Sequence, residues 1–189
     1  DPYVAVFYPS AKTNDLAGNK VVVPPSHVML RTIVKSDEVG FPWLAPAGAL
    51  RGTIDNAEAL GYVNALTGEF EQISVRESLR DTLYANRVNP LTFIPGSGLQ
   101  NYGNKTVAAT PSALDRINVA RLVAFIRDRL EVLGRGFIFE PNDTVTRNEV
   151  KNACEQLLND ITAKRGIYDY LVVCCLLYTS DAADDGLSV

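Results

Sequence analysis

Residues 112–147 read SALDRINVARLVAFIRDRLEVLGRGFIFEPNDTVTR, and this stretch decides the fold. Apolar side chains recur every three or four positions through its first half, as along one face of an amphipathic helix: Val119, Leu122, Val123, Ile126, Leu130 and Leu133. Three charged side chains are expected on the opposite face: Arg121, Asp128 and Glu131. Ser112 and Asp115 have the spacing of a capping box, and Gly134 suits the left-handed residue that ends a helix. The pattern predicts a helix that packs on a core.

The second half of this stretch predicts a rigid polar corner and a second helix. Pro141 fixes the backbone of the corner, residues 139–143. Thr146 and Glu149 have capping-box spacing, and an apolar stripe follows them: Val150, Ala153, Cys154, Leu157 and Ile161. Gly166 is expected to end this helix, and residues 168–174 are rich in strand-forming residues. Glu140 and Asp143 are close enough in sequence for an acid–base pair, but capping carboxylates are the favoured interpretation.

The chain before this stretch mixes short strands and helices. Residues 3–8 and 21–23 predict two strands of a hairpin, and Ser26 is expected to cap a helix over 27–35. The capping-box pair Ser74 and Glu77 predicts a helix that ends near residue 87, before a strand at 91–94. Because this order lacks a strict strand–helix alternation, we expect an α+β fold in which two or three amphipathic helices pack on a mixed sheet.

Two irregular segments invite a functional interpretation. Trp43 lies in a stiff apolar loop with Pro46, where a packed structural role is favoured over a ligand pocket. A glycine-rich turn, Gly96 to Gly98, follows the strand at 91–94 and could contact a phosphate if a helix came next. An extended run follows instead, so a hairpin turn is favoured, and a nucleotide-binding α/β enzyme remains only as an alternative.

Composition narrows the class of protein. The chain has 189 residues, 47% hydrophobic, with a net charge of −4 and scattered basic residues, which argues against a nucleic-acid surface. No apolar run is long enough to span a membrane. The single histidine, His27, has no partner pattern for catalysis, and the cysteines Cys154, Cys174 and Cys175 have no metal-site spacing. The sequence therefore predicts no catalytic residue, no metal and no cofactor.

Three motifs in order resemble the tail sheath proteins of contractile-tailed bacteriophages. They are residues 116–122 (RINVARL), the corner 139–143 (FEPND) and the pair Thr146-Arg147. A segment with Trp43 and Pro46 followed by Arg-Gly also fits that family. The residues that carry the resemblance are Trp43, Pro46, Arg116, Asn118, Arg121, Glu140, Pro141, Asn142 and Arg147.

The resemblance implies a structural subunit of a contractile sheath, without enzymatic activity. Such subunits form stacked hexameric rings around a tail tube, between a baseplate and a tail terminator, and contraction drives the tube through the host envelope. It implies a protein made in the host cytoplasm and located in the virion tail, with no nucleic acid or membrane as partner. Candidate subunit-interface residues are Arg121, Asp128 and Tyr170; an exposed Arg on a rigid helix suits a partner's carboxylate. The sheath of another contractile injection or secretion system is the alternative.

The resemblance also suggests how the chain divides. Residues 1–23 are expected to belong to a preceding sheath domain or a connecting hairpin, and residues 24–174 to the C-terminal, tube-proximal domain. Residues 175–189 resemble a translated sequencing adapter, so we expect a non-native, disordered tail and an internal fragment of a longer protein. Because sheath subunits link through terminal arms, the fragment is expected to be monomeric or weakly associated.

Overall fold

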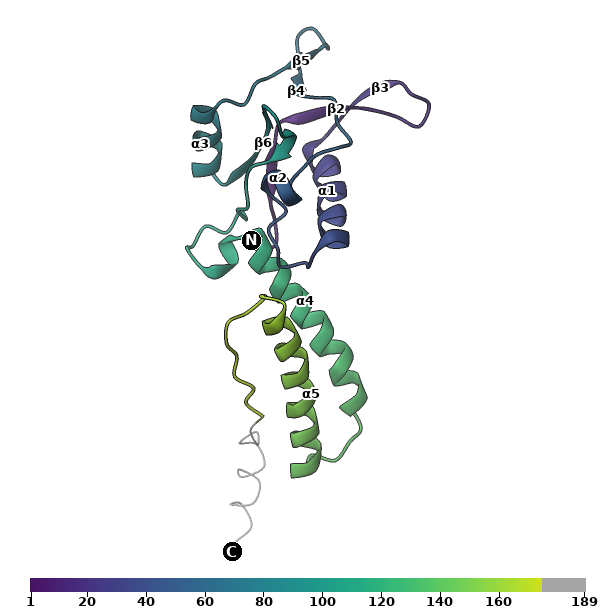
Figure 1. The fold of residues 1–189 in the computed structure, drawn as a ribbon, viewed down its shortest axis with the longest axis vertical. Helices are drawn as coiled ribbons and strands as arrows, with labels where there is room; N and C mark the ends of the chain where they lie inside the picture. Colours follow the sequence, from purple (N-terminus) through teal and green to yellow (C-terminus); the bar gives the residue numbers. More distant parts are fainter. Residues whose placement is uncertain (175–189) are drawn as a thin grey trace, which may run out of the picture. The chain divides into compact units, whose positions relative to one another are not determined.

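The computed structural model describes residues 1–174 (Figure 1). The expectation of a disordered, non-native tail at 175–189 lies outside these residues. The chain divides into two compact units, residues 1–125 and residues 126–189, and each is described by itself. Helices occur with one mixed and one antiparallel sheet, so the predicted α+β class is confirmed. No helix of the described residues is long and apolar enough to cross a membrane.

The first unit contains two small sheets. One has the strand order β1-β6-β7, with β1 parallel to β6 and β6 antiparallel to β7. The other is fully antiparallel, with the order β3-β2-β4-β5. The strands are β1 (Val6–Tyr8), β2 (Ser10–Asn14), β3 (Lys20–Val23), β4 (Ala59–Val63), β5 (Phe70–Gln72), β6 (Val88–Ile94) and β7 (Gly98–Asn101).

The expected hairpin between residues 3–8 and 21–23 is wrong. Pro9 separates β1 from β2, so β1 pairs with β6 while the polar β2 forms the hairpin with β3. The sequence of β2, SAKTN, has little strand propensity. It forms a strand because it pairs with β3 on one edge and β4 on the other. Strands within residues 1–23 therefore pair with strands from 59–94, and the division at residue 23 stays a prediction.

The glycine-rich turn is a hairpin, as predicted. Gly96 and Gly98 connect β6 to β7 with φ values of 83° and 77°, in the left-handed region that glycine adopts without steric cost. No helix begins at this turn, because β7 starts at Gly98 itself.

Four of the helices lie where the sequence predicts them and the short α2 was not predicted, but most predicted caps are wrong. They are α1 (Pro25–Val39), α2 (Gly48–Arg51), α3 (Glu77–Ala85), α4 (Ile117–Gly134) and α5 (Thr144–Ala163), with short 3₁₀ helices at Ala113–Asp115 and Arg135–Phe137. The residues at the N-caps of α1 and α3 are Pro24 and Arg76, not Ser26 and Ser74. Ser26 lies inside α1, where its hydroxyl cannot take the cap position.

The predicted caps at both ends of α4 are also wrong. Ser112 and Asp115 bound a 3₁₀ turn with no side-chain cap, and α4 begins only at Ile117. Gly134 has φ −63° and ψ −28°, so it is right-handed and the chain continues into the second 3₁₀ helix. Spacing alone therefore located the helix but not its termini, because the termini depend on where the chain must turn to reach its packing partners.

The core of the first unit lies between α1 and the strands. Six buried side chains form it: Ala11, Val28, Met29, Ile54, Leu60 and Leu91. Helix α1 contributes Val28 and Met29 from one face and packs on β1 and β2, while α3 packs on β6. The core is small and aliphatic, so polar contacts also have to hold the loops in place.

Two fully buried asparagines fasten those loops to the β6–β7 hairpin. The Asn89 amide donates to the carbonyls of Val6 (3.0 Å) and Lys105 (2.8 Å), and its oxygen accepts from the Lys105 N–H (2.7 Å). The Asn101 amide donates to the carbonyls of Pro46 (2.7 Å) and Gly103 (2.8 Å), and accepts from the Gly103 N–H (3.1 Å). Each side chain thus makes three hydrogen bonds to backbone groups of irregular segments, which have no strand or helix partner for those groups.

The second unit contains the rest of α4, then α5 and the extended segment after it. Helix α5 ends at Ala163, and Arg165, not Gly166, takes the left-handed conformation with φ 61°. The predicted apolar stripe is confirmed: Val150, Ala153, Cys154 and Leu157 are half-buried and Ile161 is fully buried.

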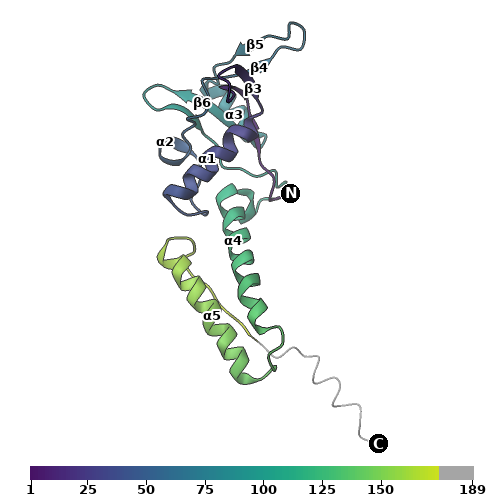
Figure 2. The ribbon, with the colours of Figure 1, turned by 90° about the vertical axis from the view of Figure 1, so that its right-hand side faces the viewer.

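The predicted strand at 168–174 is wrong. These residues are extended but pair with no strand within the described chain, and Figure 2 shows them running back alongside α5. The Tyr170 hydroxyl donates to the Glu155 carbonyl at 3.4 Å. Strand-forming residues make a ladder only where a neighbouring strand offers its backbone, and here α5 is the neighbour.

The buried amides generate a testable prediction. Asn89→Ala would leave the Lys105 N–H and two carbonyls without partners, and each buried polar group so orphaned costs about 1–3 kcal/mol. We expect a clear loss in the free energy of unfolding, measured by urea denaturation. Asn14→Ala, at an exposed position, is the control and should change it by less than about 0.5 kcal/mol. Equal stability of both variants would contradict the role of Asn89.

Candidate functional site

The motif residues of α4 form a set of contacts that ties together three segments of the first unit. Arg116 donates to the Tyr84 hydroxyl (2.7 Å) and pairs with Asp115 (3.2 Å). Asn118 donates to the Trp43 carbonyl (3.3 Å) and accepts from the Asn104 amide (2.7 Å). The motif thus connects the start of α4 to α3, to the 41–47 loop and to the segment after β7.

Arg121 contradicts the expected face of α4. The periodicity predicts this side chain on the solvent side, but its guanidinium pairs with Asp37 near the end of α1 at 2.5 Å. The two side chains are only 22% and 34% exposed, and Arg121 Nη1 and Asp37 Oδ1 are buried without a hydrogen-bond partner in the described chain. The buried residues of α4 are Ile117, Ala120 and Leu122.

The reason for this error is a rotation of the buried face. Ile117, Ala120, Arg121 and Ala124 line one small hollow together with residues 2–5, so Arg121 is on the same side of α4 as buried Ile117 and Ala120. The periodicity gave weight to the large apolar residues and so favoured Val119 and Val123, which are only half-buried. A possible role of Arg121 between subunits stays a prediction.

Trp43 and Pro46 are packed residues of the first unit, in agreement with the structural interpretation. Trp43 is 6% exposed, stacks on Phe41 with ring centroids 5.0 Å apart, and meets Phe125 edge-on at 5.4 Å. Pro46 is fully buried, and its carbonyl accepts from Asn101. Neither lines one of the hollows described in the first unit.

The polar corner of the second unit is a helix cap. Asp143, not Thr146, is the N-cap of α5, and its carboxylate accepts from the Thr146 N–H at 2.8 Å. That backbone hydrogen bond is the largest cause that holds the pKa of Asp143 below its ordinary value. Arg147 donates to Asn142 (3.2 Å) and Thr144 (3.4 Å), closing the turn. The capping interpretation of Asp143 is confirmed.

The remaining candidate residues are near the surface. Glu140 and Asp128 are exposed, and Tyr170 is half-buried against α5. His27 is exposed at the start of α1. Within residues 1–174, no group of three or more His, Cys, Asp or Glu residues is placed to hold a metal ion.

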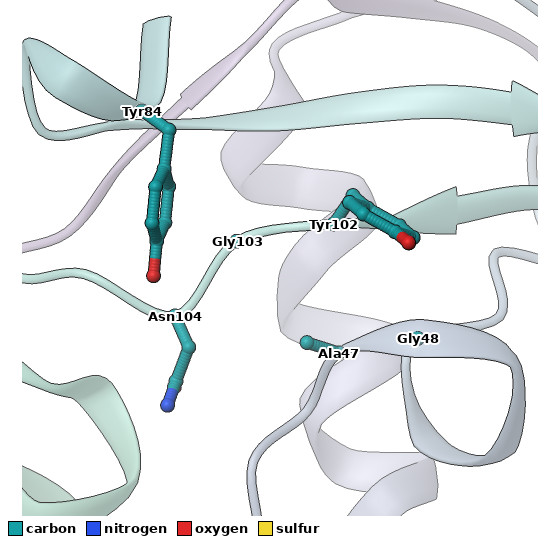
Figure 3. A pocket seen from close by; sticks show the side chains of 6 residues that line it. All are labelled: Ala47, Gly48, Tyr84, Tyr102, Gly103 and Asn104. Atoms are coloured by element: carbon teal, nitrogen blue, oxygen red, sulfur yellow. The ribbon is translucent and has the colours of Figure 1, made fainter. Parts of the chain in front are cut away.

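A small hollow lies beside the motif contacts, and sequence reasoning missed it. Tyr84 and Tyr102 line it from either side of Gly103, and Ala47, Gly48 and Asn104 complete it (Figure 3). Its volume is about 300 Å³. Lys105 Nζ lies 4.0 Å from the centroid of the Tyr84 ring, and Arg80 lies 4.9 Å from that of Tyr102. The Tyr residues are far apart in sequence, and no local pattern indicates that they meet.

Comparison with known proteins finds homologues of this chain. No family model matches the chain. The tail sheath protein of Enterobacteria phage T4 is 36% identical over 140 residues, and that of Vibrio phage KVP40 is 34% identical over 139 residues; each alignment covers 74% of this chain. The chain is homologous to bacteriophage tail sheath proteins. It spans about a fifth of the length of these two tail sheath relatives, 20% and 19% respectively.

Solved structures show the same sheath fold. The sheath complex of an extracellular contractile injection system (PVC), in the contracted state, matches with a TM-score of 0.73 and 21% identity, over 100% of this chain and 51% of that one. The contracted helical sheath of the anti-feeding prophage matches with a TM-score of 0.69 and 21% identity, over 85% and 41%. At these identities the likeness concerns the fold.

The Arg121–Asp37 pair in this sheath homologue can be tested by a double-mutant cycle. Because Arg121→Ala leaves a part-buried carboxylate without its cation, we expect a loss above the roughly 0.5 kcal/mol typical of surface changes. The coupling with Asp37→Ala should be about 1 kcal/mol or more in chemical denaturation.

The exposed pair Arg135–Glu131, whose side chains are 68% and 63% exposed, is the matched control for this cycle. Exposed pairs four residues apart on a helix couple by about 0.3–0.5 kcal/mol. A coupling of Arg121 with Asp37 no larger than that would show that the pair does not fasten α4 to α1.

Proposed function

We propose that this chain is part of a structural subunit of a contractile bacteriophage tail sheath, with no enzymatic activity. The observation that carries the proposal is the 34–36% identity to two phage tail sheath proteins over three quarters of the chain. The subunits would form stacked hexameric rings around the tail tube, bounded by the baseplate and the tail terminator. They would assemble in the host cytoplasm and become part of the virion tail.

The internal contacts suit this role mechanically. A sheath that contracts must exchange one set of subunit interfaces for another while each subunit keeps its shape. In the first unit, Asn89, Asn101 and the α4 motif residues hold loops and helices by buried hydrogen bonds and a part-buried ion pair. Packed interiors of this kind resist deformation, so motion is expected at interfaces between subunits.

The domain assignment is part of the proposal. Residues 24–174 would belong to the C-terminal, tube-proximal domain of the subunit, with residues 1–23 joining it to a preceding sheath domain. The alignments with the two phage relatives extend over 139 and 140 residues, which is long enough to include most of one such domain.

A sheath of another contractile injection system is the second candidate. The fold match to the PVC and anti-feeding prophage sheaths favours it, since the same architecture serves both kinds of machine. Genes for a phage head and terminase beside this reading frame would favour the phage tail, and their absence would favour the injection system.

The nucleotide-binding enzyme is disfavoured by the hairpin at Gly96 and Gly98. Backbone N–H groups hold phosphates where a helix begins after the glycines, and here a strand follows. We expect no saturable binding of ATP or GTP in calorimetry. Binding that is lost in Gly98→Val would support the enzyme instead.

Replacement of a homologous segment tests the sheath proposal. In the chimera, the 140 aligned residues of this chain replace their counterpart in the tail sheath protein of Enterobacteria phage T4. The chimera is supplied to cells infected by a phage that lacks its own sheath protein, and tails are viewed by electron microscopy. We expect sheathed tails that contract.

A chimera carrying the destabilising change Asn89→Ala is the control for the effect of lower stability on assembly. Cooperative thermal melting of the purified chimeras is measured alongside the microscopy. A chimera that melts cooperatively but leaves the tails without a sheath would contradict the proposed function.

A further inference from the structure

The corner between α4 and α5 presents a large apolar side chain on a fixed turn. Phe139 is 98% exposed, and its neighbour Ile138 is 66% exposed. The turn is held by hydrogen bonds from the Glu140 N–H to the Phe137 carbonyl (3.2 Å) and from the Asp143 N–H to the Pro141 carbonyl (2.9 Å). An aromatic side chain on a rigid turn buries much area at little entropic cost, which is typical of an interface anchor.

The tyrosine pocket of the first unit, lined by Ala47, Gly48, Tyr84, Tyr102, Gly103 and Asn104, has the size to take one such side chain. Its volume of about 300 Å³ is at the lower end of ligand pockets. Two tyrosine side chains line it, and Tyr102 is 52% exposed. Aromatic walls favour an aromatic occupant through edge and offset contacts between rings.

The pocket is preformed. A Cβ on Gly103 would lie 2.6–2.8 Å from the side chain and backbone of Asn89, so the backbone there is packed directly on that buried amide. Asn104 is held by Asn118, and Lys105 donates to the Tyr84 carbonyl at 2.9 Å. Because these contacts exist before anything binds, docking needs little reorganisation.

The charges of the two surfaces are complementary. Lys105 follows Asn104 of the pocket lining, lies over the Tyr84 ring and has no carboxylate as ion-pair partner within residues 1–174. Arg116, bonded to the Tyr84 hydroxyl, adds a second cation, which Asp115 partly neutralises. On the corner, exposed Glu140 directly follows Phe139 and likewise has no ion-pair partner in that part of the chain.

We propose that the Phe139 corner of one copy of this chain docks into the tyrosine pocket of another copy, with Glu140 facing Lys105. The two surfaces differ, so the contact is head-to-tail and leaves one corner and one pocket open on every complex. Such a contact can repeat from copy to copy. Its place in a sheath rests on the proposed function. A single small contact of this kind is weak.

Two complementary variants test it in the full 189-residue chain by sedimentation velocity up to about 1 mM. Phe139→Ser removes the anchor and keeps the pocket, whereas Ala47→Phe fills the pocket and keeps the anchor; the Ala47 side chain points into it in Figure 3. The wild-type chain should associate progressively with concentration. Each variant alone should associate about tenfold more weakly or worse, and their mixture should recover a complex that stops at one copy of each.

Matched controls separate this contact from general stickiness. Leu66→Ser alters an equally exposed side chain, 96%, in the β4–β5 turn, and Tyr168→Ser alters another exposed aromatic. Leu50→Phe adds an aromatic ring on α2 away from the pocket lining. These three variants should associate like the wild type. Raising the salt concentration should weaken association, because salt screens the exposed Glu140 charge, and Glu140→Lys should weaken it by placing a like charge opposite Lys105.

Each outcome of these experiments either supports or overturns the proposed contact. A wild-type chain that remains monomeric at the highest concentration, or a Phe139→Ser chain that associates like it, would overturn the inference. So would a mixture of the two variants that associates no better than either alone. If chimeric sheaths assemble and contract with Phe139→Ser, this contact fails while the proposed function stands. If the contact is found but the chimeras never enter tails, the proposed function fails while the contact between copies stands.

Discussion

The fully buried Asn89 is the contact on which the rest of the first unit depends. One side chain joins β1, β6 and the segment after β7, since its amide and oxygen together bond Val6 and both backbone groups of Lys105. Gly103 has no side chain because Asn89 occupies that space. The segment fixed in this way carries Asn104, which holds Asn118 of α4. A small aliphatic core could not by itself define the path of these loops, because they have no ladder partners of their own.

Most residues of the sheath-type motifs make contacts within the chain. Arg116, Asn118 and Arg121 hold α4 to four other segments of the first unit, and Asp143 caps α5 in the second. Motif residues in a structural protein therefore do not by themselves mark the surface where subunits meet. Most of them define a rigid building block, whereas Phe139 of the corner motif is exposed and belongs to the surface proposed for assembly.

A rigid block with weak individual contacts would suit the proposed contractile sheath. Weak contacts would let one arrangement of subunits be exchanged for another. Many weak contacts of one kind, repeated along a helical lattice, give a stable polymer whose total energy still changes cooperatively. The proposed corner-and-pocket contact is of this size, one aromatic ring and one ion pair.

The sequence by itself determined the α+β class, the positions of α4 and α5, the hairpin turn at Gly96 and Gly98, and the sheath resemblance. These depend on periodicity, on glycine's access to positive φ and on the order of short motifs, all of which are local. Tertiary structure alone decided that β1 pairs with β6, that residues 168–174 form no strand, that Arg121 faces Asp37 and that Tyr84 and Tyr102 share a pocket. The reason is physical: strand partners, buried ion pairs and pockets join residues tens of positions apart. Their energies depend on which distant group is present, and no local spacing records that.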